Sequence, residues 1–261
     1  MSRTYNCSLL VFLLCCSFSL CMGQTQEHKI AMSTGKLIVE EINKVNFESH
    51  SGNEVIISYE GEPYKLPERA QGLRSISASG KQDNTQMGLN VKRDGDKATI
   101  SSVSKKRSKR YLIKVPKGVS IYYEHSTYNG GKINFHNLPN EIEVDAHYNP
   151  IYLENTTGPV AISTVYGKIE AVFQRLSKEH TVKLYSVYQL VDVTLPRSIA
   201  ADVKLSSSYG EMFTNFEFDS NNDKDKMKNL SKSKISGTIN GGGTLIDITS
   251  TYQNIYLRKA E

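Results

Sequence analysis

Residues 142–154 have the sequence IEVDAHYNPIYLE, residues 160–172 have VAISTVYGKIEAV, and residues 182–194 have VKLYSVYQLVDVT. In each stretch, aliphatic residues stand six and four positions before a tyrosine, a small residue stands two before it, and an aliphatic residue follows three after it. Alternation at two-residue spacing is typical of a strand with one buried face, and the change of parity after the tyrosine indicates a bend. Each stretch is therefore predicted to form a strand, a bend and a second strand.

The pattern recurs around five tyrosines that are 18, 22, 21 and 43 residues apart: Tyr148, Tyr166, Tyr188, Tyr209 and Tyr252. Another unit is expected upstream, around Tyr128. The 43-residue interval has room for two units, or for one unit with an inserted polar loop at about residues 219–236. Internal self-similarity of this kind is typical of repeat architectures.

A period of ~20 residues with two strands per period predicts an all-β fold, a single-stranded parallel β-helix or β-solenoid, because one coil buries its apolar face only against a stacked neighbour. We expect solenoid repeats over residues 118–261. Residues 24–117 are expected to form an irregular N-terminal β region with a hairpin around Asp94-Gly95. The alternative is a β-sandwich of consecutive hairpins, which does not predict the same residue types in register five times.

Residues 1–23 have the layout of a cleavable secretory signal. One cation, Arg3, precedes an apolar stretch that ends before polar Gln24. A membrane anchor is the alternative, but it needs ~20 strongly apolar residues, and this stretch is shorter and contains serines. Lipidation at Cys16 or Cys21 is a second alternative. All four cysteines lie in this segment, so no disulfide, thiolate metal site or cysteine nucleophile is expected after export.

The net charge and the distribution of apolar residues limit the expected partners and the expected location. The formal net charge of +5 is too small over 261 residues to indicate a nucleic-acid partner. The sequence after the signal has no second apolar run of membrane-spanning length, so no transmembrane segment is expected in the mature chain. The expected location is the periplasm, the outer-membrane surface or the extracellular space.

Residues 111–119, YLIKVPKGV, precede bends in which glycine and a polar residue are followed by isoleucine, as in Gly167-Lys168-Ile169. These features resemble a bacterial putative-adhesin family of unknown function, in which an aliphatic-Val-Pro-Lys-Gly-Val entry precedes repeated Gly-polar-Ile bends. The resemblance covers roughly residues 36–258 and implies an exported, β-helical cell-envelope protein with no assigned activity. Three coils depart from the family's glycine, at Pro150, Gln189 and Gln253.

The six tyrosines named above are candidates for a binding surface or a structural ladder. Tyrosine has a flat apolar face and a hydroxyl, so a row of them suits stacking on sugar rings. Alternatively, like residues stacked at ~4.8 Å between coils stabilise the fold itself. The structural ladder is the preferred interpretation, because the tyrosine has the same parity as the buried residues before it.

A basic run supplies a second candidate surface through Lys105, Lys106, Arg107, Lys109 and Arg110. Such a run suits contact with lipopolysaccharide, an anionic glycan or a protein partner. A solvated loop is the preferred interpretation.

No motif predicts a catalytic, cofactor or metal site. The histidines lack His-Glu-x-x-His spacing, although His125 and His147 fall in neighbouring predicted coils. Polysaccharide lyases and hydrolases with β-helical folds need paired carboxylates or an acidic calcium cluster. The nearest candidates are scattered on predicted outward faces: Glu143, Asp145, Glu154 and Glu170. We therefore expect no catalysis.

Together these features predict an exported β-solenoid of the cell envelope or surface, an adhesin-like scaffold that binds a glycan or a surface protein. The alternative is a carbohydrate-binding or carbohydrate-active β-helix. Because the open ends of a solenoid leave strand edges unpaired, homo-oligomerisation by edge or end stacking is a further expectation. The sequence leaves the ligand, the handedness and the oligomeric state open.

Overall fold

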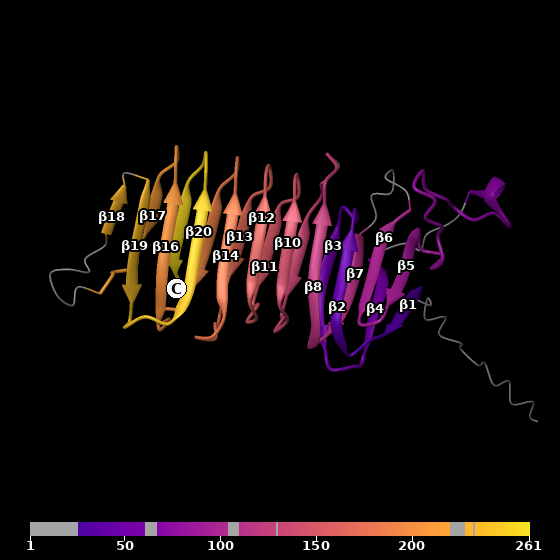
Figure 1. Ribbon diagram of the computed structural model, residues 1–261, viewed down its shortest axis with the longest axis horizontal. Coiled ribbons are helices and arrows are strands. Elements are labelled where there is room, and N and C mark those ends of the chain that lie inside the picture. The colour runs from indigo at the N-terminus through magenta and orange to yellow at the C-terminus, as the bar shows by residue number, and fades with distance from the viewer. Residues whose placement is uncertain (1–25, 61–66, 104–109, 129, 220–227, 232) are drawn as a thin grey trace, which may run out of the picture.

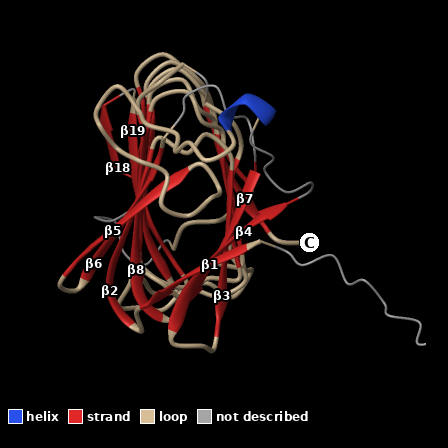
Figure 2. Ribbon diagram, turned by 90° about the vertical axis from the view of Figure 1, so that its right-hand side faces the viewer, coloured by secondary structure: helices blue, strands red, loops and turns tan. Residues whose placement is uncertain are grey.

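The computed structural model describes residues 26–60, 67–103, 110–128, 130–219, 228–231 and 233–261, which form two large mixed β-sheets. The sheets face each other as two layers (Figure 2), and their strands lie side by side along the long axis of the molecule (Figure 1). A one-turn 3-10 helix, η1 (Glu68–Ala70), is the only helix in this part of the chain. The predicted all-β class is confirmed. Residues 1–23, predicted to be a secretory signal, lie outside the described residues.

The two sheets are listed here in their spatial order. The 10-stranded sheet consists of β1 (Glu27–Ala31), β4 (Glu54–Glu60), β7 (Arg110–Pro116), β3 (Val45–His50), β9 (Ile133–His136), β11 (Ile151–Glu154), β13 (Ile169–Val172), β15 (Val191–Leu195), β21 (Ile255–Lys259) and β17 (Met212–Thr214). The 11-stranded sheet consists of β18 (Lys228–Ser231), β19 (Lys234–Ile239), β16 (Ala201–Ser207), β20 (Thr244–Ser250), β14 (Thr181–Ser186), β12 (Val160–Thr164), β10 (Ile142–Ala146), β8 (Gly118–His125), β2 (Thr34–Glu40), β6 (Lys97–Ser102) and β5 (Leu89–Asp94).

We use the word coil for one strand of the 11-stranded sheet together with the strand of the 10-stranded sheet that follows it in the chain. Neighbouring coils pair in parallel: Ile142 of β10 lies opposite Val160 of β12, and Ile151 of β11 lies opposite Ile169 of β13. Residues that align in the sequence thus lie opposite one another. The prediction of a wholly parallel solenoid is wrong at the two ends of the sheets. The antiparallel pairs there are β1–β4, β4–β7, β5–β6, β16–β19 and β18–β19.

The order of the coils in space differs from their order in the chain at both ends. Strand β20 lies between β14 and β16, and β21 lies between β15 and β17, so the last coil, β20–β21, is inserted between the coils β14–β15 and β16–β17. Likewise, the coil β2–β3 lies between β6–β7 and β8–β9. The chain on either side of residue 117 therefore contributes strands to both sheets.

The inward residues of the two sheets form one hydrophobic core. Strand β10 illustrates the pattern, because Ile142, Val144 and Ala146 are buried while Glu143 and Asp145 between them are exposed. β-Branched side chains such as Ile and Val pack well on a pleated surface, which favours strands at these positions. The alternation in the sequence thus gives the correct inward face for this strand.

At the β18 end of the 11-stranded sheet, the structure differs from the inserted loop that we expected at about residues 219–236. Strands β18 and β19 form an antiparallel hairpin there, and β19 also pairs with β16. Phe218 lies against Gly237, and Phe216 is buried at the end of the core. The hairpin covers an edge of β16 that would otherwise present unpaired backbone groups. At the other end, the hairpin expected around Asp94-Gly95 is confirmed as β5–β6.

The described residues include no helix with the length and apolar character needed to cross a bilayer.

Candidate functional site

Five of the six candidate tyrosines form a continuous stack at the bends after β10, β12, β14, β20 and β16. These bends lie along the upper edge of the ribbon in Figure 1. In spatial order they are Tyr148, Tyr166, Tyr188, Tyr252 and Tyr209, and we call them the tyrosine ladder. Successive ring centroids are 4.8, 4.9, 4.8 and 4.9 Å apart, with interplanar angles of 16°, 6°, 7° and 3°. Tyr252 is fourth in the stack although it is last in the chain.

The tyrosine ladder lies on the surface. Tyr188 is 39% exposed, Tyr166 is 46% exposed, and Tyr209, at the end of the ladder, is 74% exposed. The parity argument for a buried position is therefore wrong, because the bend turns the tyrosine outward while the small residue two positions earlier stays buried. Tyr128 is 80% exposed, and none of the ring pairs among the described residues includes it.

Buried hydroxyl groups form a second ladder beneath the tyrosines. It consists of Thr164, Ser186, Ser250 and Ser207, each at most 2% exposed, and we call it the hydroxyl ladder. Each hydroxyl accepts a hydrogen bond from the backbone N–H three residues later, at 3.0, 3.2, 3.3 and 2.9 Å respectively. The three serines also donate to a backbone carbonyl in the bend of a neighbouring coil, at 2.9 Å for Ser186, 3.1 Å for Ser250 and 3.4 Å for Ser207.

We did not predict the hydroxyl ladder from the sequence, because we described this column only as a column of small residues. The available signal was that four of the five residues in the column carry a hydroxyl. The fifth, Ala146, lacks one, and in its coil the buried Asn149 donates from Nδ2 to the Gly131 carbonyl at 2.8 Å and to the Tyr123 hydroxyl at 3.2 Å. Buried polar groups need partners, so these side chains serve to hold one coil to the next.

Stacking determines which parts of the tyrosines a ligand reaches. A sugar ring stacks on an aromatic face, but both faces of Tyr166, Tyr188 and Tyr252 are covered by neighbouring rings at 4.8–4.9 Å. The outer faces of Tyr148 and Tyr209, at the two ends, are not covered by another ring of the ladder. The interior of the ladder therefore presents ring edges and hydroxyls to solvent.

The acidic candidates are divided between the two sheets. Glu143 and Asp145 lie on β10 of the 11-stranded sheet, whereas Glu154 and Glu170 lie on β11 and β13 of the 10-stranded sheet. Their outward faces point in opposite directions, so the two pairs do not face each other across a common site. Glu154 forms an ion pair of 3.1 Å with His136. Within the described ranges, no group of three or more His, Cys, Asp or Glu side chains is arranged to hold a metal ion.

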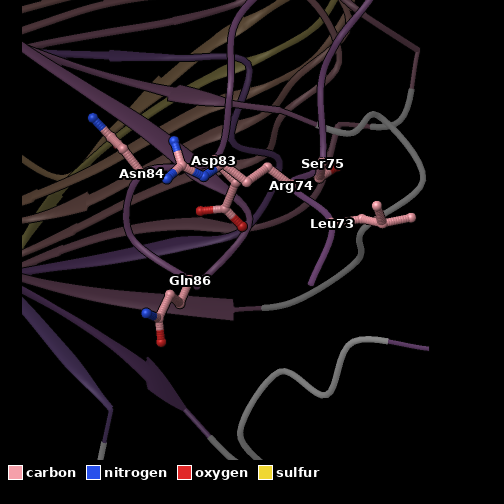
Figure 3. Close-up of a pocket in the computed structure, with 6 residues that line it drawn as sticks. All are labelled: Leu73, Arg74, Ser75, Asp83, Asn84 and Gln86. Carbon is pink, nitrogen blue, oxygen red and sulfur yellow. The ribbon is translucent and has the colours of Figure 1, made fainter. Parts of the chain in front are cut away.

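A pocket of about 380 Å³ lies at the N-terminal end of the molecule (Figure 3), and it is lined by Leu73, Arg74, Ser75, Asp83, Asn84 and Gln86. The Asp83 carboxylate accepts hydrogen bonds from the backbone N–H groups of Thr85 and Gly88, at 3.1 and 2.8 Å. Asn84 makes two hydrogen bonds of 2.8 Å with the backbone of Val91. These polar side chains hold the loop itself, so we assign no ligand to this pocket.

The basic run falls mostly outside the described part of the chain. Lys105, Lys106, Arg107 and Lys109 lie outside the described residues. Arg110 is the first residue of β7, where it pairs with Glu60 of β4 in the sheet. The structure therefore does not bring these cations together as a described surface.

Comparison with known proteins identifies no family for this chain. No family model matches the sequence, and no curated protein matches it. A solved structure described as a putative cell adhesion protein from Clostridium sporogenes is 12% identical, with a TM-score of 0.45, covering 91% of this chain and 100% of that chain. A second, described as a putative adhesin from Bacteroides fragilis, is 10% identical, with a TM-score of 0.36, covering 91% and 98%. Similarities at this level support no argument about function.

Proposed function

We propose that the protein is an exported β-solenoid scaffold of the cell envelope or surface that binds a macromolecular partner, as an adhesin-like protein, without catalysis. The parallel register of neighbouring coils supports the solenoid architecture. The signal-like residues 1–23 and the resemblance of the sequence to an exported family support the location. The division of the acidic residues between two opposite faces supports a role without catalysis.

The observation that carries the proposal is that the tyrosine rings at the bends of neighbouring coils stack on one another. Stacked aromatic pairs contribute about 0.5–1.5 kcal/mol each beyond the area that they bury. The four pairs of the tyrosine ladder therefore contribute roughly 2–6 kcal/mol, which is large beside the net stability of about 5–15 kcal/mol of a typical domain. A row of residues with this structural contribution suits a stiff scaffold.

The alternative, a carbohydrate-binding or carbohydrate-active β-helix, requires a different use of the same residues. Sugar rings would have to stack on the outer faces of Tyr148 and Tyr209, which no other ring of the ladder covers, or contact the ring edges along the ladder. A glycan or a surface protein remains the candidate partner of the scaffold, and the ladder interior suits hydrogen bonding through its hydroxyls more than stacking.

The test is binding of purified residues 24–261 to a glycan array, with the Tyr166→Ala/Tyr188→Ala double variant and a Tyr185→Ala control. Tyr185 is 40% exposed, close to the 39% of Tyr188, but it lies on the outer face of β14 outside the ladder. We expect the double variant to lose thermal stability and the control to lose little. Selective binding of one glycan class that a folded double variant loses, and the control keeps, would support the carbohydrate-binding alternative and overturn a purely structural role of the tyrosine ladder.

Export has its own test. The N-terminus of protein recovered outside the cytoplasm, or from the membrane fraction, is sequenced chemically or by mass spectrometry. The proposal expects a mature chain that begins at Gln24, and a full-length chain retained in the cytoplasm would contradict it.

A further inference from the structure

The outer edge of β17 is an open end of the repeated structure. The outermost strands of the two sheets are β1, β5, β17 and β18, and all but β17 pair antiparallel with their neighbour. Strand β17 pairs in parallel with β21, in the register of the repeated coils, with Phe213 opposite Tyr256. None of the described strands pairs with its other edge. The antiparallel end strands interrupt the parallel stack, whereas β17 leaves it open to one more strand.

The backbone groups of two residues on β17 face this open edge. The carbonyl of Glu211, directly before the strand, accepts a hydrogen bond from the Ile255 N–H of β21 at 2.9 Å. In a parallel pair, alternate residues direct both of their backbone groups to the same neighbour, so Phe213 also faces β21. Met212 and Thr214 therefore direct their N–H and C=O groups away from β21. An edge with such groups is a template for β-strand addition by another chain.

The inward side chains of β17 are less covered than their counterparts in the other coils. Thr214 is exposed and Met212 is half-buried. The residues in the same two columns on β9, β11, β13, β15 and β21 are at most 2% exposed: Ile133, Phe135, Ile151, Leu153, Ile169, Ala171, Val191, Val193, Ile255 and Leu257. Apolar side chains on one more strand would cover the inward face of β17 as they cover the others.

The facing sheet extends beyond β17. The 11-stranded sheet continues past β16 with β19 and β18, whereas the 10-stranded sheet ends at β17, the partner of β16 in its coil (Figure 1). After β17 the chain crosses to β19, where the Asp219 N–H donates to the Thr238 carbonyl at 2.8 Å, and Phe216 in this crossing is buried at the end of the core. A second copy stacked end to end would bring both of its sheets against the overhanging hairpin β18–β19. The open edge therefore suits one extended segment rather than a second copy.

The outer face of β17 indicates which side chains such a segment carries. Phe213 is 44% exposed and stacks on Tyr256, with ring centroids 5.3 Å apart and an interplanar angle of 11°. No second described ring covers the other face of Phe213. Glu211, two residues earlier, is exposed and forms no ion pair with a described residue. An aromatic residue opposite Phe213 and a cation opposite Glu211 would complement this face.

We propose that β17 binds an extended segment of a partner protein by antiparallel β-strand addition. The segment has an aromatic residue opposite Phe213 and a cation opposite Glu211. It also has apolar residues opposite Met212 and Thr214. In an antiparallel pair this places the cation two residues after the aromatic residue, which is the order in β21, Ile-Tyr-Leu-Arg over residues 255–258. The inference rests on the proposed function of a binding scaffold and names an extended polypeptide as its partner.

The test is an NMR titration of purified residues 24–261 with the synthetic peptide NIYLRKA, which has the sequence of residues 254–260. We expect the amides of Met212 and Thr214 to exchange freely in the protein alone, and to shift and become protected when the peptide binds. Phe213→Ser should weaken binding roughly 2- to 10-fold, the contribution of one stacked aromatic pair. Tyr185→Ser is its control and should leave binding unchanged, because Tyr185 is 40% exposed but lies on the interior strand β14.

Two further comparisons isolate the backbone and the charge. Thr214→Pro removes the outward N–H, whereas Thr214→Ala keeps it and loses the same hydroxyl. Binding should fall roughly tenfold or more in the first variant, because a hydrogen bond of the added strand is lost, and should persist in the second. Glu211→Lys should weaken binding of NIYLRKA and favour the peptide that carries Arg258→Glu.

The outcomes decide the proposal as follows. Binding that Thr214→Pro loses and Thr214→Ala keeps supports it, and if Thr214→Pro does not fold, the charge exchange at Glu211 decides in its place. Three results overturn it: no resonance change on β17 at millimolar peptide, a protected Thr214 amide in the protein alone, or dimerisation in sedimentation velocity that Glu211→Lys and Phe213→Ser abolish. The second would assign the edge to a segment of the same chain, and the third to a second copy. The scaffold proposal is judged separately, by the glycan array and the tyrosine variants.

Discussion

Ser186→Ala is the sharpest test of the hydroxyl ladder. The Ser186 hydroxyl is buried, accepts from the Gln189 N–H at 3.2 Å, and donates to the Gly167 carbonyl of the neighbouring coil at 2.9 Å. Alanine keeps the space nearly filled but leaves both backbone groups without this partner. An unsatisfied buried polar group costs about 1–3 kcal/mol, so we expect the free energy of unfolding to fall by about 2–3 kcal/mol.

The assay is urea unfolding followed by circular dichroism, with Ser206→Ala as the control. Ser206 directly precedes Ser207 of the hydroxyl ladder on β16, points away from the core and is half-buried, so its replacement should change stability by less than about 0.5 kcal/mol. A loss of about 2–3 kcal/mol corresponds to a drop in the thermal midpoint of roughly 4–12 °C for a chain of this size. Equal effects of Ser186→Ala and Ser206→Ala would refute the structural role of the hydroxyl ladder.

Three further perturbations test other parts of the structure. Gly167→Ala would place a Cβ 1.9 Å from the Asn149 carbonyl oxygen, so we expect a loss of about 3 kcal/mol in chemical denaturation, and an unchanged midpoint would contradict the close approach of these bends. Tyr188→Ala removes two stacked pairs and Tyr209→Ala removes one, so the losses should be about 1–3 and 0.5–1.5 kcal/mol, and the reverse order would argue against a ladder. Burial acts to raise the pKa of the Glu41 carboxyl, but hydrogen bonds from neighbouring groups hold this pKa below 4.5. The ionised carboxylate therefore stabilises the fold above about pH 4.5, and this stabilisation is lost as the pH falls further. Glu41→Gln should reduce the loss of stability at acid pH, measured by unfolding curves over a pH series.

The tyrosine ladder illustrates what the pattern of one chain can and cannot predict. The sequence placed Tyr148, Tyr166 and Tyr188 in one column, and the structure stacks them at 4.8–4.9 Å. It did not predict their exposure, because parity applies along a straight strand and is lost where the backbone bends. Nor did it predict that Tyr252 lies between Tyr188 and Tyr209, since that depends on which coils become neighbours.

The approach of Glu41 to His125 could not be predicted from the sequence for a related reason. His125 and His147 were expected in neighbouring coils, but Glu41 comes from a region that we predicted to be irregular. Its carboxylate lies 4.0 Å from Nε2 of the ring because the coil β2–β3 inserts beside β8–β9. Contacts between residues more than 80 positions apart leave no periodic signal in the chain.

The sequence by itself determined the all-β class, the inward face of the repeated strands and the positions of their bends, because these depend on local alternation of apolar and polar residues. The tertiary structure decided the order of the coils, the antiparallel hairpin β18–β19 and the exposure of the tyrosine ladder. The physical reason is that every coil has nearly the same inward columns, so their apolar pattern is compatible with several neighbours. The choice among them is made by edge pairing and packing at the ends, which depend on the whole folded chain.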